Sequence, residues 1–233
     1  MCYNYGMFDV LKEKNLISSK AEEEKLYKFL ILLKEWNEKF NLTSIKNDLE
    51  IEIKHFEDSL YGAFLFSENK SVVEIGSGGG FPSMPLMIKR NDLKFTLVES
   101  VGKKCEFLKH VISTLNLNGV VLNKRAEDLG KDKVYRESFD IVTARAVASL
   151  NTLSEYTLPL IKKGGQFIAY KSVNDELCLA KNAINVLGGK FNNEYRYSLS
   201  NDCGERVIYI IDKVNPTPAN YPRGNGKERS KPL

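Results

Sequence analysis

The sequence is poor in the residues that build metal centres and disulfide frameworks. It has four cysteines and two histidines among 233 residues. No two cysteines stand in a Cys-x-x-Cys pair, so neither a zinc site nor a disulfide-stabilised fold is expected. We therefore expect no metal and four reduced cysteines, namely Cys2, Cys105, Cys178 and Cys203.

Long apolar runs and a targeting segment are also missing. No run approaches the roughly 20 apolar residues that are needed to span a bilayer. The opening residues, MCYNYGMFDVLKEK, lack the basic region and apolar core of a signal peptide. These absences lead us to expect a cytoplasmic protein with no membrane partner, and we expect it to act as a monomer.

An excess of positive charge is small over the whole chain and is concentrated at its end. The formal net charge is +4. Residues 216–233 are rich in Pro, Gly and Asn and carry four basic residues against a single acid, Glu228. Such a segment is typical either of a tail that binds a polyanion, usually nucleic acid, or of an irregular solvated end. Its basic residues are Arg223, Lys227, Arg229 and Lys231.

The hydrophobic patterning divides the chain into three parts. Residues 1–70 have helical spacing, residues 71–214 alternate short β-branched runs with helical stretches, and residues 215–233 form the basic tail. The alternation predicts an α/β domain whose mostly parallel sheet is covered by helices on both faces, preceded by a helical extension. Only four residues separate the runs 191–200 and 205–212, which predicts an antiparallel hairpin and one reversed strand at the end of the sheet.

The helical extension has its own start signal. Ser19 followed by Glu22 predicts a capping box, and apolar residues then recur at helical spacing as far as Trp36 and Phe40, which we expect to be core residues. A second helix is predicted over about residues 49–66.

A glycine-rich loop, EIGSGGGFP, follows the first strand of the alternating region. A phosphate-binding P-loop is excluded because no Lys follows the glycines. A dinucleotide fingerprint is disfavoured because Phe81 stands where the third glycine is required, and Pro82 offers no amide to a pyrophosphate. The pattern that remains, acid-x-Gly-x-Gly-x-Gly, resembles motif I of the class I methyltransferases that use S-adenosyl-L-methionine (AdoMet). Its residues are Glu74, Gly76, Gly78 and Gly80.

Two acids suit this ligand. Glu74 ends the strand before the loop and can accept hydrogen bonds from the cofactor ammonium group. Glu99 ends the next strand, 19 residues after Gly80, where a carboxylate can hold both ribose hydroxyls of an adenosine. NAD enzymes share the second feature, so Glu99 argues for adenosine rather than for AdoMet alone.

Seven segments in the same order resemble the RsmG (GidB) family of small-subunit rRNA guanine-N7 methyltransferases. They are WNEKFNLTSI (36–45), HFEDSL (55–60), EIGSGGGFPSMPL (74–86), LVESVGKKCEFL (97–108), KRAED (124–128), TARAV (143–147) and YPRGNGKERSKPL (221–233). The resemblance covers nearly the whole chain; Glu99 stands where many members have Asp. It implies a class I methyltransferase fold, AdoMet as cofactor, and one guanine in the decoding-region loop of 16S rRNA, within a small-subunit particle, as substrate.

The resemblance also implies roles for particular residues. Phe81 is expected to pack against AdoMet, although it also suits a core position. Ala126 and Glu127 match positions beside the adenine. Arg145 is expected to be important for activity, by binding the AdoMet carboxylate, an RNA phosphate or guanine O6; the alternative is a surface pair with Asp140 or Glu155.

The expected chemistry explains why no catalytic His or Cys stands out. Guanine N7 has a free lone pair, so an in-line attack on the methyl group requires no general base. Two other hypotheses stay open: methylation of a small molecule or protein, which a basic tail does not favour, and a non-enzymatic RNA-binding protein, which the intact glycine motif does not favour.

RNA contacts are expected from basic residues near the predicted crevice and from the tail. Cations are disfavoured at the start of a helix, so Lys103 and Lys104 suggest phosphate binding there. The full set is Lys103, Lys104, Lys171, Arg223, Lys227, Arg229 and Lys231. His55 and Asp58, one helical turn apart, are interpreted as a hydrogen-bonded structural pair in preference to part of an RNA-binding face.

Overall fold

The computed structural model describes residues 8–173 and 176–233. Residues 1–7, which include Cys2, and residues 174–175 lie outside the described residues.

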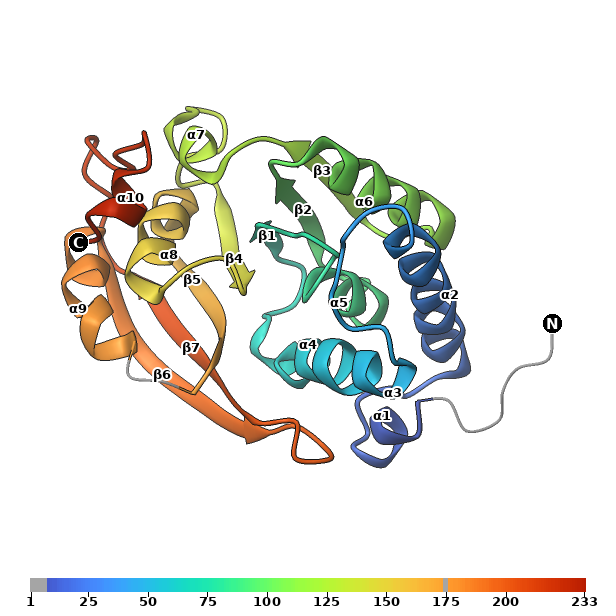
Figure 1. Ribbon diagram of the computed structural model, residues 1–233. Helices are drawn as coiled ribbons and strands as arrows, with labels where there is room; N and C mark the ends of the chain where they lie inside the picture. Colours follow the sequence, from blue (N-terminus) through green and yellow to red (C-terminus); the bar gives the residue numbers. More distant parts are fainter. Residues whose placement is uncertain (1–7, 174–175) are drawn as a thin grey trace.

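Helices precede a region in which strands and helices alternate (Figure 1). The first part contains α1 (Asp9–Glu13), α2 (Lys20–Asn37), α3 (Asp48–Ile51), the π-helical turn η1 (Glu52–Glu57), α4 (Asp58–Tyr61) and the 3-10 turn η2 (Ala63–Leu65). The second contains β1 (Ser71–Ile75), α5 (Ser83–Lys89), β2 (Lys94–Glu99), α6 (Gly102–Leu115), β3 (Gly119–Asn123), α7 (Ala126–Lys131), β4 (Phe139–Arg145), α8 (Leu150–Thr157), η3 (Leu158–Leu160), β5 (Ile161–Ser172), α9 (Glu176–Val186), β6 (Gly189–Ser198), β7 (Glu205–Lys213) and α10 (Lys227–Ser230).

Seven strands form one sheet in the order β3-β2-β1-β4-β5-β7-β6. The first five strands pair in parallel, whereas β7 is antiparallel to both β5 and β6. The predicted mostly parallel sheet with a reversed last strand is confirmed, but β7 lies between β5 and β6 rather than at the sheet edge. The direction of winding changes between β1 and β4, so the carboxyl ends of these two strands form the topological switch point, where open α/β sheets bind ligands.

Apolar side chains cover both faces of the sheet. Val72 and Leu97 face one buried cluster, which they share with the N-terminal helices, α5 and α6. Val73 and Val98 face a second cluster, which they share with α8 and α9. Neighbouring strand residues therefore point to opposite sides, as the period of two in a strand requires.

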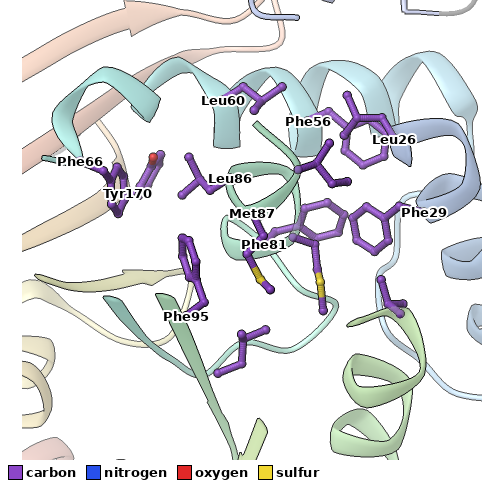
Figure 2. Close-up of a cluster of buried hydrophobic side chains, with 14 of the residues drawn as sticks. Leu26, Phe29, Phe56, Leu60, Phe66, Phe81, Leu86, Met87, Phe95 and Tyr170 are labelled. Carbon is purple, nitrogen blue, oxygen red and sulfur yellow. The ribbon is translucent and has the colours of Figure 1, made fainter. Parts of the chain in front are cut away.

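The N-terminal helices and the sheet share one core. Figure 2 shows Leu26, Phe29 and Phe56 from these helices beside Phe81, which follows the glycine loop. The ring centroids of Phe29 and Phe81 are 5.3 Å apart. The predicted boundary at residue 70 therefore marks a change of secondary structure within a continuous apolar cluster.

The prediction for the start of α2 is confirmed, whereas the prediction for the residues at its end is only partly correct. The capping box is confirmed, because Ser19 Oγ accepts a hydrogen bond from the Glu22 amide at 3.2 Å. Trp36 and Phe40 are half-buried at the edge of the core rather than inside it. Lys103 Nζ lies over the face of the Phe40 ring, 5.1 Å from the ring centroid.

The helix predicted over residues 49–66 is interrupted by the π-helical turn η1. Such turns are rare and are frequently found at functional sites. This one contains Lys54 and His55, both of which line cavities described below.

The tail is irregular apart from the short helix α10, but it packs against α8, which contradicts the alternative of a free solvated end. Arg223 pairs with the buried Glu155 of α8, with Nη2 and Oε2 2.7 Å apart. Thr152 Oγ1 donates to the Glu228 carbonyl at 2.8 Å, and the side chain of Glu228 is itself buried. These contacts hold α10 against α8.

Within the described residues, no helix combines the length and the apolar character needed to cross a membrane.

Candidate active site

The glycine loop lies at the carboxyl end of β1, at the switch point of the sheet. Gly76 has φ +70°, and a Cβ there would lie 2.6 Å from Val147 Cγ2, so the loop runs directly against the segment after β4. Gly78 has φ +51°, and only the Gly76 carbonyl oxygen, at 3.8 Å, lies within 4 Å of the position of its missing Cβ. The loop is therefore packed on one side and open on the other.

Glu99 connects this loop to the next helix. Its Oε2 accepts a hydrogen bond from the Gly78 amide at 2.9 Å, and its Oε1 accepts one from the Val101 amide at 2.8 Å. A carboxylate offers about four acceptor positions. The two amides fix the orientation of Glu99 and leave it able to accept further hydrogen bonds from a ligand.

Two adjoining cavities run along the carboxyl ends of β1, β2 and β4. Their volumes are about 360 and 320 Å³. Both are lined by Gly76, Glu99 and Val147, and so they form one elongated depression, which we call the loop crevice. The first cavity is also lined by Ser100, Ala126, Glu127, Tyr156, Gly226 and Arg229, and the second by Thr43, His55, Gly78, Phe81, Lys104 and Arg145.

Arg145, at the end of β4, is surrounded by residues of the N-terminal region. Its Nη1 donates to Asp58 Oδ2 at 2.7 Å, and its Nη2 donates to His55 Nδ1 at 3.2 Å. The guanidinium carbon lies 5.2 Å from the centroid of the Phe81 ring. A surface pair with Asp140 or Glu155 was therefore the wrong alternative for Arg145.

Asp58 is buried and joins three parts of the fold. Its Oδ2 binds Arg145, and its Oδ1 accepts a hydrogen bond from the Tyr197 hydroxyl of β6 at 2.7 Å. Among the described contacts, His55 and Asp58 are linked through Arg145 rather than to each other. The hydrogen-bonded pair that we predicted is thus replaced by two separate contacts to the same arginine.

The protonation of His55 follows from its neighbours. An arginine only donates, so Nδ1 of His55 accepts, and Nε2 carries the proton that is donated to Thr43 Oγ1 at 2.8 Å. Burial, and next the charge of Arg145, lower the pKa of His55 to about 3. The imidazole is therefore neutral at physiological pH.

A third cavity, of about 380 Å³, adjoins the loop crevice. It shares His55, Arg145 and Ala146 with the crevice. Its remaining charged lining residues are Lys54, Asp58, Lys171, Glu176 and Arg206. Four cations face two carboxylates, and we call this space the basic cavity. Ala146, at the junction of the two spaces, has φ +56°, a backbone conformation that is unfavourable for alanine and is often found at functional sites.

Glu74 is fully buried in β1 and is not among the residues that line the crevice. Burial raises its pKa to about 7, against the opposing effects of Ser83, Ser77 and Arg145. Neither carboxylate oxygen has a hydrogen-bond partner of normal geometry among the described residues. Its contact with a cofactor ammonium group stays a prediction.

The structure brings most of the other predicted cofactor residues together. Phe81 is 7% exposed, so it is a core residue that also lines the crevice. Ala126 and Glu127, at the start of α7, line its first cavity. Gly80 instead packs against α5, where a Cβ would lie 2.5 Å from Met84 Cγ.

The predicted RNA-binding residues fall into two groups. Lys104 and Arg229 line the crevice, and Lys103, Lys227 and Lys231 are exposed. Lys171 and Arg223 are held in ion pairs: Lys171 Nζ lies 2.6 Å from Glu176 Oε2, and Arg223 is bound by Glu155.

Several lining residues were missed at the level of sequence. Thr43, Val147, Tyr156 and Gly226 carry no chemical signal that distinguishes them from loop or core positions. Thr43, Val147 and Gly226 lie within segments that resemble the family, and that was the only available signal.

Comparison with known proteins identifies the family. A sequence model described as GidB, rRNA small subunit methyltransferase G, matches residues 22–198. The ribosomal RNA small subunit methyltransferase G of Staphylococcus aureus (strain bovine RF122 / ET3-1) is 48% identical over 228 residues, covering 96% of this chain and 95% of its own. The chain belongs to this family. The protein of the same name from S. aureus strain Newman is 47% identical over the same length.

Solved structures of methyltransferases share the fold of this family member. M. jannaschii TYW2 in complex with AdoMet superposes with a TM-score of 0.54 at 16% identity, over 69% of this chain and 76% of its own. A SAM-dependent O-methyltransferase from Thermotoga maritima gives a TM-score of 0.53 at 12% identity, over 80% and 73% of the two chains. The methyltransferase fold expected from the sequence is confirmed.

The chemistry of the loop crevice fits AdoMet. The cofactor has no phosphate and so requires no lysine in the glycine loop. Gly78 leaves open space beside the backbone, and Glu99 retains acceptor positions for hydroxyl groups. Across residues 8–173 and 176–233, no three His, Cys, Asp or Glu side chains gather as a metal site requires.

Proposed function

We propose that this chain transfers a methyl group from AdoMet to N7 of one guanine in the decoding-region loop of 16S rRNA. Membership of the small-subunit rRNA methyltransferase family supports the reaction class and the RNA. The fit of the loop crevice to an adenosine-containing cofactor supports the methyl donor. A ribosomal substrate agrees with a cytoplasmic location and with a small-subunit particle as the partner.

The loop crevice provides the residues that would hold the cofactor. Glu99 would bind the ribose hydroxyls through its remaining acceptor positions, and Ala126 and Glu127 would lie beside the adenine. The methionine end would pass along Gly76, Gly78 and Phe81, with Gly80 shaping the loop from behind and the carboxylate of Glu74 attracting the cofactor ammonium group. When bound, AdoMet supplies an electrophilic methyl group.

One observation carries the assignment to N7: the titratable groups His55, at the junction of the crevice and the basic cavity, and Asp58, in the basic cavity, are already engaged. His55 is neutral and its acceptor nitrogen is used by Arg145, while Asp58 is bound by Arg145 and Tyr197. An acceptor that must first lose a proton would need a free base here. Guanine N7 carries its own lone pair, so alignment can suffice, and alignment supplies about 7–11 kcal/mol in favourable cases.

The arrangement also explains how an arginine can stand beside a cationic methyl donor. Asp58 lies 2.7 Å from Arg145 and offsets its charge. Arg145 can then position the acceptor or the cofactor carboxylate without opposing the binding of the donor.

The basic residues would bind rRNA phosphates. Lys104 and Arg229 line the cofactor crevice, and the exposed Lys103, Lys227 and Lys231 would add positive charge to the surface. Lys171 and Arg223 would contribute only where RNA competes with their carboxylate partners.

The test is methyl transfer to small-subunit particles from a strain that lacks the endogenous activity. The protein is incubated with radiolabelled AdoMet, and the label is mapped to a base. We expect label at N7 of a single guanine. Glu99→Ala and Gly78→Trp should abolish the label. Gly164→Ala, a control substitution in β5, should retain it. AdoMet binding by calorimetry without label in any rRNA would overturn the rRNA assignment and favour another acceptor. Absence of AdoMet binding would overturn the enzymatic assignment.

A further inference from the structure

The basic cavity is placed to receive the acceptor side of the reaction. It meets the loop crevice at His55, Arg145 and Ala146, so a group inside it reaches the same junction as a ligand in the crevice. Its volume of about 380 Å³ lies within the range of about 300–1,000 Å³ found for small-molecule sites. Enzymes that modify a base commonly draw the nucleotide out of its stack into such a pocket.

The carboxylates of the basic cavity do not leave it acidic. Asp58 is paired with Arg145 at 2.7 Å. Glu176 is paired with Lys171 at 2.6 Å, and it also accepts the Leu150 amide at 2.8 Å. Each carboxylate is therefore matched by one cation inside the cavity, and two of the four cations remain.

The two remaining cations are Lys54, on the π-helical turn, and Arg206, on β7. Lys54 Nζ is bound by Glu50, which is not among the cavity-lining residues, at 2.5 Å. Arg206 Nε forms a longer ion pair with Asp58, 3.7 Å from Oδ1, and Arg206 Nη1 donates to the carbonyl of its neighbour Glu205 at 3.0 Å. Both side chains are partly exposed, at 32% and 22%.

Lys54 and Arg206 line the same cavity from different elements. The pKa of Lys54 is raised, chiefly by its hydrogen bond to Glu50, and the charge of Arg206 is a minor opposing effect. An anion between the two cations would interact favourably with both.

We infer that Lys54 and Arg206 form a phosphate clamp, which holds the backbone phosphate beside the target nucleotide while the base reaches the junction at Arg145. This inference rests on the proposed function, because it takes an RNA nucleotide as the ligand of the basic cavity. The clamp joins the N-terminal region to the reversed strand β7, so the acceptor site exists only when these two parts are packed together.

The experiment measures KM for small-subunit particles over a series of KCl concentrations. A single-stranded phosphate contact contributes about 0.7 to the slope of log affinity against log salt. We expect Lys54→Gln and Arg206→Gln each to raise KM about tenfold at low salt and to reduce the slope by at most about 0.7, the contribution of the one clamped phosphate. Because the clamp does not touch the loop crevice, AdoMet affinity should stay within twofold.

Three further variants separate the clamp from general effects. Lys54→Arg and Arg206→Lys keep the charge and should keep most of the salt slope. Lys190→Gln removes an exposed cation from the far end of β6 and should change neither KM nor the slope. If Arg206→Gln does not fold, Lys54→Gln, at a partly exposed position, decides the question alone.

An unchanged salt slope in the folded Gln variants, with wild-type label at guanine N7, overturns the clamp and leaves the proposed function in place. Label at another atom overturns the proposed function, while a reduced slope still assigns the basic cavity to RNA phosphate.

Discussion

The loop crevice and the basic cavity meet at Arg145 but are built in different ways. The crevice is shaped by backbone: a short glycine loop, the amides held by Glu99, and the ends of neighbouring parallel strands. The basic cavity is shaped by side chains from η1, β4, β5, α9 and β7, which are held by ion pairs. A backbone-built site tolerates few changes of conformation, whereas a side-chain-built site depends on charges that must balance across distant segments.

The largest effect is expected where the side-chain network is broken. Arg145→Ala removes the close cationic partner of Asp58, which is 6% exposed, and leaves it only the Tyr197 hydroxyl and the more distant Arg206. Removing one member of a buried pair commonly costs about 3–5 kcal/mol. Urea unfolding should show this loss, and the double variant Asp58→Asn, Arg145→Met should recover part of it. A loss below 1 kcal/mol in the single variant would show that the pair does not organise the junction.

A slightly smaller effect is expected where the backbone is altered. Gly76→Ala combines a left-handed conformation with a contact of 2.6 Å to Val147, and we expect a loss of about 2–4 kcal/mol together with weak AdoMet binding. Gly164→Ala is the matched control, because its φ is +87° with nothing within 4 Å. It should cost only about 1–2 kcal/mol and bind AdoMet normally. Equal behaviour of the two variants would contradict a tightly packed loop.

The third prediction uses pH to probe the junction. The folded-state pKa of His55, about 3, lies below its ordinary value of 6.5. Below pH 6.5 the unfolded chain therefore binds a proton at His55 that the folded chain does not bind. The contribution of His55 to stability is intact above pH 6.5 and falls as the pH drops toward 3, by about 2 kcal/mol at pH 5. When the pH is lowered from 7 to 5, the free energy of unfolding measured with urea should fall by about 2 kcal/mol more in wild type than in His55→Asn. Parallel losses in wild type and His55→Asn would refute the neutral His55.

The smallest effect concerns the crevice. The pKa of Glu74 is raised from 4.5 to about 7, so in the folded protein its carboxylate is protonated below that pH. If the ionised form binds the cofactor ammonium group, AdoMet affinity rises about tenfold, or about 1.4 kcal/mol, between pH 6 and 8. Glu74→Gln should bind more weakly and without this rise. Calorimetry at both pH values measures this rise in affinity. The same rise in Glu74→Gln would show that Glu74 does not interact with the cofactor.

The two sites differ in how far the sequence predicts them. The glycine loop and Glu99 lie within one βαβ unit, so local spacing is enough to bring them together. The partner of Arg145 could not be predicted in this way, because Asp58 is far away in sequence and the alternatives Asp140 and Glu155 have the same charge. The π-helical turn gives no signal, since its residues fit a regular helix equally well. The position of β7 inside the sheet is likewise a matter of long-range pairing, because a hairpin pattern fixes the turn and not which strand lies at the edge.

The folded tail has a consequence for how the protein is made. Gly226 and Arg229 line the same crevice as Gly76 and Glu99, although the glycine loop is synthesised far earlier. A chain emerges from the ribosome amino-terminus first, at about 5–20 residues per second. The sheet and both apolar clusters can therefore assemble while one wall of the crevice is still missing, and the cofactor site is closed only once residues 226–229 have been translated.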